Sequence, residues 1–514
     1  MSLVSSINIA NQALLVNQSA ITAVSNNISN VDTEGYSKLN VHLASVVNYT
    51  PSAGNALSIA NSLSGVELSK VERSTSSYLQ NYYWQENSTD SYLSKYTTIA
   101  TNVENLTNEL NTTGLSTALS NFYTAANALN QNPSDITVRQ NFISVAESVC
   151  SVFNSISKNL SDLRTSLVGN TTNSTTLDSS EVAGNVQNVN NLLDQIASIN
   201  YNIIKTNSKN TSSSVLLDQR DKLIGELSSL IPTTVTQNSN GTVDISLGDY
   251  SLLKSSTISG YLDATTGDTS NPAIINIVDK NNTTISSNIN SAITGGKIGA
   301  ILDACGSDST KFTISGVLSD LNTLASQFAS AFNEIQTGDP AGDGTTAMCM
   351  DSSSKTLIPA TQDIFTTKDG SATLTAGNIG VNSTVKNNAY LIAAARIDTM
   401  TTPSYANATG NNSNTTLILA ARNATYNALG SVTMETYLAS TVSKVGTDVK
   451  SLNNNLTSQD AVLAEVKTQL SSATGVNLDQ ELVDLIKYQR SYQAAARVFT
   501  VCSDLMGELI NLGK

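Results

Sequence analysis

Residues 3–31 read LVSSINIANQALLVNQSAITAVSNNISNV and carry apolar residues at heptad positions. This spacing predicts a helix over about residues 3–30 with one apolar stripe, interrupted by the polar Asn17. We define the N-terminal seam as this stripe: Leu3, Ile7, Ala10, Leu14, Ile21, Val24, Ile28 and Val31. The end of the chain repeats the spacing, and the C-terminal seam consists of Leu478, Leu482, Leu485, Tyr492, Ala496, Phe499, Met506 and Ile510.

Each seam needs a partner, because an isolated amphipathic helix is only marginally stable in water and leaves its apolar stripe exposed to solvent. The sequence therefore predicts that residues 1–40 and 478–514 form an antiparallel coiled pair, as monomer core or between copies of the chain. Asn17, Gln489 and Ser503 weaken the pairing while restricting its register, which favours use between subunits. In a free monomer such arms are expected to fray or to be disordered.

Composition limits the classes of function. The chain has 514 residues, enough for about three domains, and a net charge of -14 with 13% charged residues. Without clustered Lys and Arg, binding to nucleic acid or to an anionic membrane is disfavoured. No apolar run approaches the roughly 20 residues that cross a bilayer, so membrane insertion is not expected. The first basic residue is Lys38, so a secretory signal is not expected either.

Cysteine and histidine usage argues against a chemical site. The four cysteines, Cys150, Cys305, Cys349 and Cys502, form no C-x-x-C pair, and buried free thiols are expected. His42 is the only histidine and is expected at the surface.

Three short motifs were weighed against catalytic or ligand-binding roles. Asp218 and Asp221 around Arg220 favour a solvated ion pair or a helix-start contact over a glycosidase dyad. Asp339, Asp343 and Gly344 imitate a calcium loop, but Ala341 and Met350 occupy ligand positions. Gly296-Lys297 lacks the other residues of a phosphate loop. We therefore predict no catalytic residue, no cofactor and no metal site.

The apolar period changes along the chain and predicts a mainly α fold with β-rich insertions. Long terminal helices form the coiled pair, a helical bundle follows, and outer β-rich domains are inserted into it. The expected segments are the N-terminal axial helix 1–40, the helical domain 41–230, a small β unit 231–299, a returning helix 300–336, a variable β-rich insertion 337–435, a long helix 436–477 and the C-terminal axial helix 478–514.

Short segments at both ends resemble known sequences. Ala23–Val31, followed by Gly35 and Tyr36, is similar to the signature shared by rod, hook and junction proteins of the bacterial flagellum, with Asn26 and Asn27 at its centre. Glu34 stands where that group commonly has Pro. Gly475, Asn477 and Leu478, with residues 488–495, resemble the companion C-terminal signature.

The interior distinguishes between these proteins. The segment Leu217, Asp218, Gln219, Arg220 and Asp221, leading into a hairpin around Asn240-Gly241, resembles the hook-associated protein 1 (FlgK) family of hook–filament junction proteins. The resemblance spans nearly the whole chain except residues 340–415.

This resemblance implies a structural, non-enzymatic subunit that forms a ring between the flagellar hook and the second hook–filament junction protein. It implies that the ring adapts the hook lattice to the filament and permits filament assembly, and that each copy contacts further copies and the hook protein. It also implies export by the flagellar type III system without a cleaved signal, an extracellular location, and a cytoplasmic chaperone on the C-terminal helix. The alternatives are a hook or distal-rod subunit, or a secreted adhesin or carbohydrate-processing enzyme with its function in 337–435.

Overall fold

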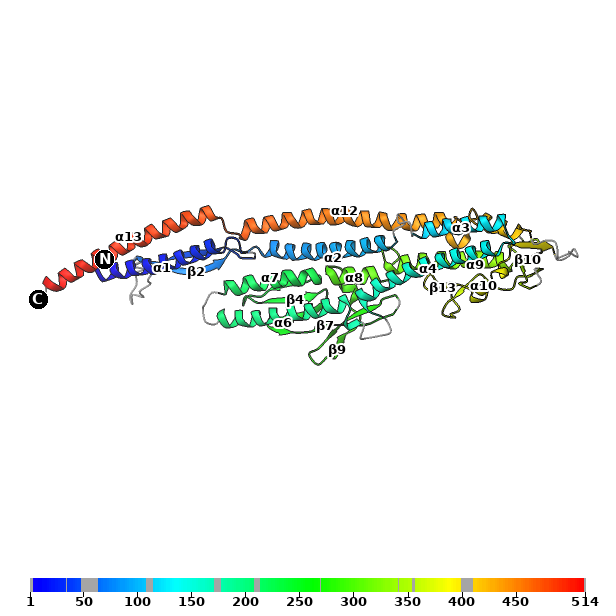
Figure 1. Ribbon diagram of the computed structural model, residues 1–514. Helices are drawn as coiled ribbons and strands as arrows, with labels where there is room; N and C mark the ends of the chain where they lie inside the picture. The colour runs from blue at the N-terminus through cyan, green and yellow to red at the C-terminus, as the bar shows by residue number, and fades with distance from the viewer. Residues whose placement is uncertain are drawn as a thin grey trace.

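The computed structural model describes residues 3–33, 35–47, 63–107, 114–170, 177–207, 213–268, 270–340, 342–353, 356–398 and 410–512. The molecule is elongated, with both termini at one end and the segment expected to be variable at the other (Figure 1). The predicted fold class is confirmed, since long helices dominate and several small sheets are attached to them. No helix of the described residues is long and apolar enough to span a membrane.

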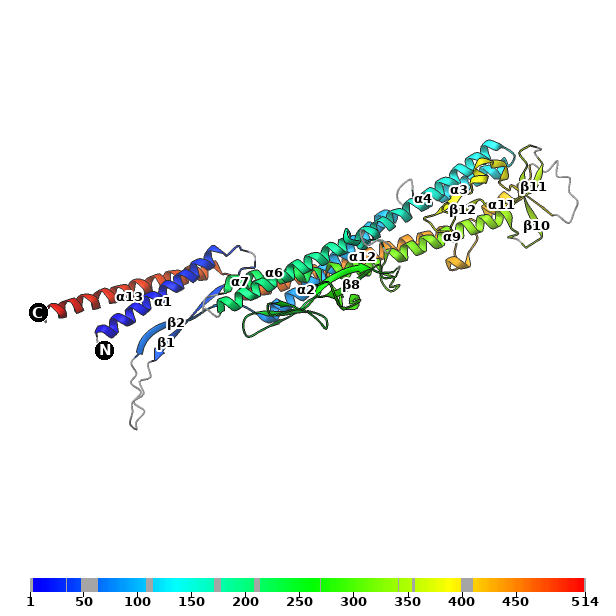
Figure 2. The same cartoon turned by 90° about the horizontal axis from the view of Figure 1, so that it is seen from below.

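The two ends of the chain lie side by side. α1 (Leu3–Ser29) runs antiparallel to α13 (Leu478–Leu512), as Figures 1 and 2 show. After α1, Gly35 turns the chain with a φ of +81°, a conformation that glycine adopts without strain. β1 (Leu39–Val47) and β2 (Leu63–Arg73) then pair antiparallel, and we refer to this two-stranded sheet as the ribbon. The ribbon lies beside α1, with Gly65 against Ile9 and Gln12.

The helical body begins beyond the ribbon. α2 (Ser77–Thr107) and α12 (Met434–Thr474) run along each other, and α4 (Ile136–Val168), α6 (Glu181–Asn207), α7 (Ser214–Leu230) and α8 (Gly296–Cys305) pack beside them. A continuous apolar core joins these helices, with the fully buried Trp84 in it. α12 begins two residues before the expected range 436–477, where Thr433 caps it, and ends three residues before the end of that range, at Gly475.

Two small sheets pack against this body. β3 (Thr234–Gln237), β4 (Val243–Leu247), β5 (Tyr250–Lys254) and β6 (Thr257–Ile258) form an antiparallel sheet in chain order. β7 (Tyr261–Thr266), β8 (Ala273–Val278) and β9 (Thr284–Ser286) form the second one, before a short helical turn η1 (Asn290–Ala292). The alternating apolar residues of β4 face the helices, as its burial pattern shows.

The outer end has its own core. α3 (Leu115–Gln131) and α9 (Ile314–Thr337) join the outer half of α4 around Phe122, Phe328 and Phe332, whose ring centroids lie 4.8–5.3 Å apart. Residues 342–432 add short elements around this core: β10 (Thr345–Met350), β11 (Leu357–Pro359), β12 (Phe365–Thr367), β13 (Ile379–Val381), α10 (Ser383–Asn387), η2 (Ala389–Leu391), β14 (Ala395–Asp398), α11 (Ser413–Ala420) and η4 (Asn427–Leu429).

A pair of carboxyl groups lies between α2 and α12. Asp90 of α2 faces Asp460 of α12, beside Glu86, Gln459 and Lys467. Burial first, and then the neighbouring Asp460, raises the pKa of Asp90 from 3.8 to about 6, while Lys467 opposes the rise. The folded chain therefore holds a proton that the unfolded chain has released.

This proton predicts a pH dependence of stability. The free energy of unfolding should fall as the pH rises from 3.8 to about 6, because the folded pKa is raised. Asp90→Asn should remove that part of the slope and be more stable than the wild type at pH 7. Urea unfolding of the wild type and of Asp90→Asn at pH 4.5 and pH 7 measures the free energies of unfolding. If these free energies differ between the two proteins by the same amount at both pH values, the explanation is contradicted.

Candidate assembly site

The α1–α13 contact uses only part of each predicted seam. On α1, Ala10 and Val24 are buried, while Leu3, Ile7, Leu14, Ile21 and Ile28 are half-buried. On α13, Leu485, Ala496, Phe499 and Met506 are half-buried. The remaining seam residues stay exposed, namely Val31, Leu478, Leu482, Tyr492 and Ile510. The pair thus leaves much of the C-terminal seam uncovered.

A second apolar stripe on α13 faces away from α1, and the heptad analysis missed it. Its members are half or more exposed and form two groups of helical spacing, Val483 with Ile486 and, three turns later, Val498, Val501, Leu505 and Leu509. Gln489 and Ser503, which we expected inside the pairing, are exposed as well. Runs such as Leu482-Val483 and Leu505-Met506 were the available signal, since adjacent apolar residues point to different faces of a helix. A helix that is apolar on opposite faces is typical of a position between several partners.

The surface of α1, in contrast, is polar but uncharged. Its 27 residues include no Asp, Glu, Lys, Arg or His, and its exposed residues are mainly Asn, Gln, Ser and Thr. Depletion of charge is the compositional mark of the buried centre of protein interfaces. The terminal pair therefore offers an apolar face on one helix and a neutral polar face on the other.

A hydrogen-bond network fixes the pair to the rest of the chain, and Asn27 lies at its centre. The fully buried Asn27 amide donates to the Leu39 carbonyl oxygen at 3.0 Å and to Glu481 Oε2 at 2.9 Å. Its Oδ1 accepts hydrogen bonds from Leu39 N and from the Tyr36 hydroxyl, both at 2.9 Å. One side chain of α1 thus joins the turn after α1, the start of β1 and the first turn of α13.

Glu481 is held from a second side. Lys38 Nζ lies 2.7 Å from Glu481 Oε1, and the Glu481 side chain is only 1% exposed. The backbone of Lys38 bonds to the end of α12, donating from N to the Thr474 carbonyl oxygen at 2.8 Å. A buried carboxylate requires such a cation and such donors to offset its lost hydration.

The interior motif supplies the third part of the network. Arg73, at the end of β2, lies 2.8 Å from Asp218 Oδ1 and 2.5 Å from Asp221 Oδ2. Arg220 binds the other oxygen of Asp221 and donates to the Gly241 carbonyl oxygen at 2.7 Å. These groups are largely buried, so the solvated ion pair, one of the two roles that we expected, is wrong, and the two aspartates make a structural contact in the first turns of α7 instead. No sequence pattern marks Arg73, which lies 145 positions before Asp218.

We define the junction network as Asn27, Tyr36, Lys38, Arg73, Asp218, Arg220, Asp221 and Glu481. Burial, followed by the charges of Asp218 and Glu481, raises the pKa of Tyr36 to about 12, so its hydroxyl remains a donor to Asn27. Burial also raises the pKa of Asp218, and Arg73 counteracts this rise. A groove of about 700 Å³ opens beside the network and is lined by Arg73, Tyr36, Gly35 and Gly475.

The remaining motif residues lie around the network without joining it. Asn477 caps α13 by accepting from Gln480 N at 3.1 Å. Asn26, Gln219 and Leu478 are exposed, and Leu217 is half-buried. The two terminal signatures and the interior motif, remote in sequence, therefore meet at one place in the fold.

Comparisons with known proteins find relatives among flagellar proteins. Residues 100–351 match the flagellar hook-associated protein FlgK helical domain, and residues 469–512 match the C-terminal domain of the flagellar basal body rod proteins FlgEFG. Flagellar hook-associated protein 1 of Bacillus subtilis is 24% identical over 530 residues, covering 98% of this chain and 97% of that protein. The chain is similar over nearly its whole length to flagellar hook-associated protein 1.

Two further proteins are similar to this chain, one in sequence and one in fold. The hook-associated protein 1 of Salmonella typhimurium is 25% identical over 579 residues, covering 98% of this chain and 99% of that protein. The hook junction protein FlgK of Burkholderia pseudomallei has a similar fold, with a TM-score of 0.57, 16% identity and coverage of 77% of this chain and 100% of that one.

The single histidine and the four cysteines, considered above for other chemistry, have the following environments. His42 is half exposed, and its Nε2 lies 3.4 Å from Glu72. Cys150, Cys305 and Cys349 are buried free thiols, and Cys502 is partly exposed. Within the described ranges, no three His, Cys, Asp or Glu side chains gather as a metal site would require.

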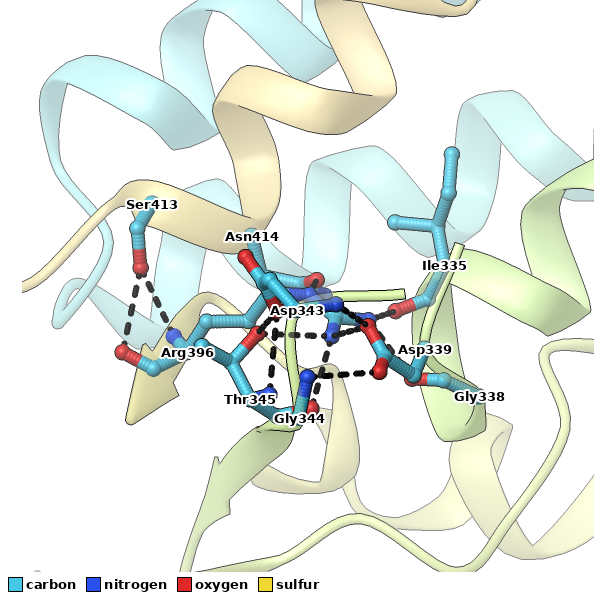
Figure 3. Close-up of polar contacts among 9 residues, drawn as sticks. All are labelled: Ile335, Gly338, Asp339, Asp343, Gly344, Thr345, Arg396, Ser413 and Asn414. Carbon is cyan, nitrogen blue, oxygen red and sulfur yellow. Dashed lines mark hydrogen bonds and ion pairs between the residues drawn. The ribbon is translucent and has the colours of Figure 1, made fainter. Parts of the chain in front are cut away.

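The segment with Asp339, Asp343 and Gly344, which resembles part of a calcium loop, lies beside the Arg396 side chain. The Asp339 carboxylate accepts from Gly344 N at 2.9 Å, and its Oδ1 lies 3.8 Å from Arg396 Nη1. Arg396 also donates to the Gly338 carbonyl oxygen at 2.7 Å and to Asn414 Oδ1 at 2.9 Å (Figure 3). A guanidinium group thus closes the C-terminal end of α9, where backbone carbonyls lack helical partners.

Replacement of Arg396 by Met should weaken the outer end of the molecule. The change removes the hydrogen bonds that Arg396 donates to the carbonyl oxygens of Ile335, Gly338 and Thr345. We expect a loss of about 2–4 kcal/mol in the free energy of unfolding of this part. Urea unfolding followed by hydrogen exchange of α9 and β10 measures the effect. The control is Arg422→Met, which removes a half-exposed ion pair with Glu435 and should cost less than about 1 kcal/mol. If both variants lose the same free energy of unfolding, the hydrogen bonds of Arg396 do not have the stabilising role given to them here.

Proposed function

We propose that this chain is a structural subunit of the hook–filament junction of a bacterial flagellum. The observation that carries the proposal is the terminal pair, whose α13 is apolar on two opposite faces while α1 carries no charge. A single α1 covers only one face of α13, so we expect further copies or neighbouring subunits to bury the other apolar face of α13. The full-length similarity to proteins named flagellar hook-associated protein 1 supplies the class of assembly.

In the proposed assembly, copies form a ring that adapts the hook lattice to the filament and permits filament growth. Residues 1–40 and 478–514 line the inner tube through both seams. The helical segments 41–230, 300–336 and 436–477 make lateral contacts, while segments 231–299 and 337–435 face outwards. The junction network fixes the angle at which the terminal pair leaves the helical body, because its bonds connect α1, α13, β2 and α7.

The proposed partners follow from this position. They are the hook protein on one side and the second hook–filament junction protein on the other. Before assembly, the exposed stripe of α13 suits a cytoplasmic chaperone that shields it from water. We propose that the type III apparatus exports the chain without a cleaved signal and that it acts outside the cell without catalysis.

Localisation tests this proposal directly. Antibodies against the helical body, coupled to gold particles, are applied to isolated hooks with attached filaments and viewed by electron microscopy. We expect label only at the boundary between hook and filament. Label along the hook or rod would favour the alternative of a hook or distal-rod subunit, and no label on flagella would exclude the proposed location.

A further inference from the structure

The face of α13 that points away from α1 carries two exposed arginines. Arg490 and Arg497 lie between the two apolar groups of the second stripe, and Ala494 joins them at helical spacing. We define the outer face of α13 as Val483, Ile486, Arg490, Ala494, Arg497, Val501, Leu505 and Glu508, which are all exposed. No described residue forms a hydrogen bond or an ion pair with either arginine. Because arginine is enriched at protein interfaces, this face has the composition of a contact surface.

α1 has three faces, and one of them is uncovered. The N-terminal seam lies against α13, while Ile9 and Gln12 lie against the ribbon beside Gly65. The residues of the third face recur every three or four positions and are all exposed, and we define the free face of α1 as Val4, Asn8, Asn11, Leu15, Gln18, Thr22, Ser25 and Ser29. Its two apolar members, Val4 and Leu15, are 55% and 58% exposed.

The symmetry of a ring limits which faces can meet. A rotation relates each copy to the next, so a surface of one copy meets a different surface of its neighbour. The terminal pair lies at one end of the elongated molecule, beyond the helical body, so the terminal pair of the next copy is its nearest neighbour in a ring (Figures 1 and 2). The outer face of α13 therefore needs another exposed face of a terminal pair, and the free face of α1 is available along the whole helix.

The free face of α1 complements the outer face of α13 chemically. A guanidinium group only donates hydrogen bonds, and the side-chain oxygens of Asn and Gln accept them. The free face offers three such amides, on Asn8, Asn11 and Gln18, and no cation that would repel an arginine. Its apolar side chains can pack against the aliphatic ones of the outer face and remove both from water.

The heights of the residues along the two helices agree as well. Within one copy the Asn27 amide binds Glu481, which fixes the register of the antiparallel pair. Asn11 lies 16 residues before Asn27, and Arg497 lies 16 residues after Glu481. Since both helices rise by about 1.5 Å per residue, equal steps reach equal heights. To within one residue, this register places at the same height Asn11 and Arg497, Gln18 and Arg490, and Val4 and Leu505.

We propose that the outer face of α13 in one copy packs against the free face of α1 in the next copy of the ring. Arg497 then donates to Asn11 of the next copy, Arg490 donates to Gln18 of the next copy, and the second stripe of α13 is buried. Repetition of this contact around the ring alternates α1 and α13. The contact rests on the proposed function, because it requires copies side by side, and it names the two surfaces that join them.

An exchange of charge between the two faces tests the contact in cells that lack the wild-type gene. Asn11→Lys places a cation opposite Arg497 of the next copy, so we expect at least a tenfold loss of the chain from isolated hooks, measured by immunoblot. Adding Arg497→Glu to the same chain should restore the wild-type amount, because each contact then pairs a lysine with a glutamate. Adding Arg490→Glu instead should not restore it, because position 490 lies about 10 Å further along α13.

The control for folding is thermal unfolding of the helical body, which should be unchanged in all these variants because the three positions are exposed on the terminal pair. A wild-type amount of Asn11→Lys at the hook would overturn the contact. Restoration by both glutamates equally, or by neither, would overturn it too.

Cross-linking gives a second measurement that needs no repulsion. Copies with Asn8→Cys and copies with Val501→Cys, both also carrying Cys502→Ser, are expressed together, and isolated flagella are oxidised. Positions 8 and 501 face each other across the proposed contact, so we expect disulfide-linked dimers. None should form when Ser25→Cys replaces Asn8→Cys, because position 25 lies about 25 Å further along α1. Absence of dimers from flagella that contain both variants would overturn the contact. Absence of the wild-type chain from the hook tip would instead overturn the proposed function.

Discussion

Replacing Leu485 and Phe499 together by Asp is expected to abolish incorporation of the chain into the flagellum. Both side chains are half-buried on the face of α13 that meets α1, so two carboxylates would have to lose hydration against an apolar stripe. Immunoblots of isolated hooks should show less than about a hundredth of the wild-type amount, because two such penalties exceed a few kcal/mol. Swimming in soft agar should be lost as well.

The same variant distinguishes an assembly surface from the core of the monomer. The helical body has its own cores, and α13 contributes no side chain to them. Thermal unfolding of that body should therefore be unchanged. Gln493→Asp, at an exposed polar position of α13, is the matched control and should assemble normally. If the variant fails to assemble and its helical body also no longer unfolds at the wild-type temperature, the seam belongs to the monomer core instead.

Replacing Arg73 by Met is expected to cost about 3–5 kcal/mol, because it leaves the largely buried Asp218 without its cation and leaves Asp221 with Arg220 alone. The loss should appear in urea unfolding and as faster hydrogen exchange in β2 and the first turns of α7. The angle of the terminal pair would no longer be fixed, so fewer copies should assemble. Lys158→Met, which breaks an exposed ion pair with Asp162, should cost less than about 0.5 kcal/mol.

The pH dependence of the stability lost in Arg73→Met tests whether the lost ion pair is the cause. Burial already raises the pKa of Asp218 in the wild type, and the loss of Arg73 removes an opposing influence. The folded variant then binds protons more readily than the unfolded chain, so its deficit should shrink as the pH falls through the acidic range. Asp218→Asn added to Arg73→Met should recover part of the loss at pH 7. A deficit that is equal at pH 4.5 and pH 7, with no recovery, would contradict the ion-pair explanation.

Sequence patterns were sufficient for the elements that depend on local periodicity. The heptads from Ile7 to Ile28 mark α1, and the turn signal at Asn240-Gly241 lies between β3 and β4. The glycine of the first signature, Gly35, has the positive φ expected of it. Such features are decided by a few neighbouring residues, so their prediction does not require the tertiary fold.

Contacts between remote residues could not be predicted in this way. Arg73 carries no local pattern, and only the fold brings it to Asp218 and Asp221. The second stripe of α13 escaped notice because a heptad count follows one face of a helix. Residues 342–398 have strands of three to six residues, too short for a period to stand out.

Deletion of the gene tests the proposed junction role most directly. Cells without the chain should carry hooks that lack filaments, as seen by electron microscopy, and should shed filament subunit into the medium, as detected by immunoblot. Return of the wild-type gene should restore filaments, and the Leu485→Asp, Phe499→Asp double variant should not. Filaments of normal number and length on the deleted cells would contradict a role at the hook–filament junction.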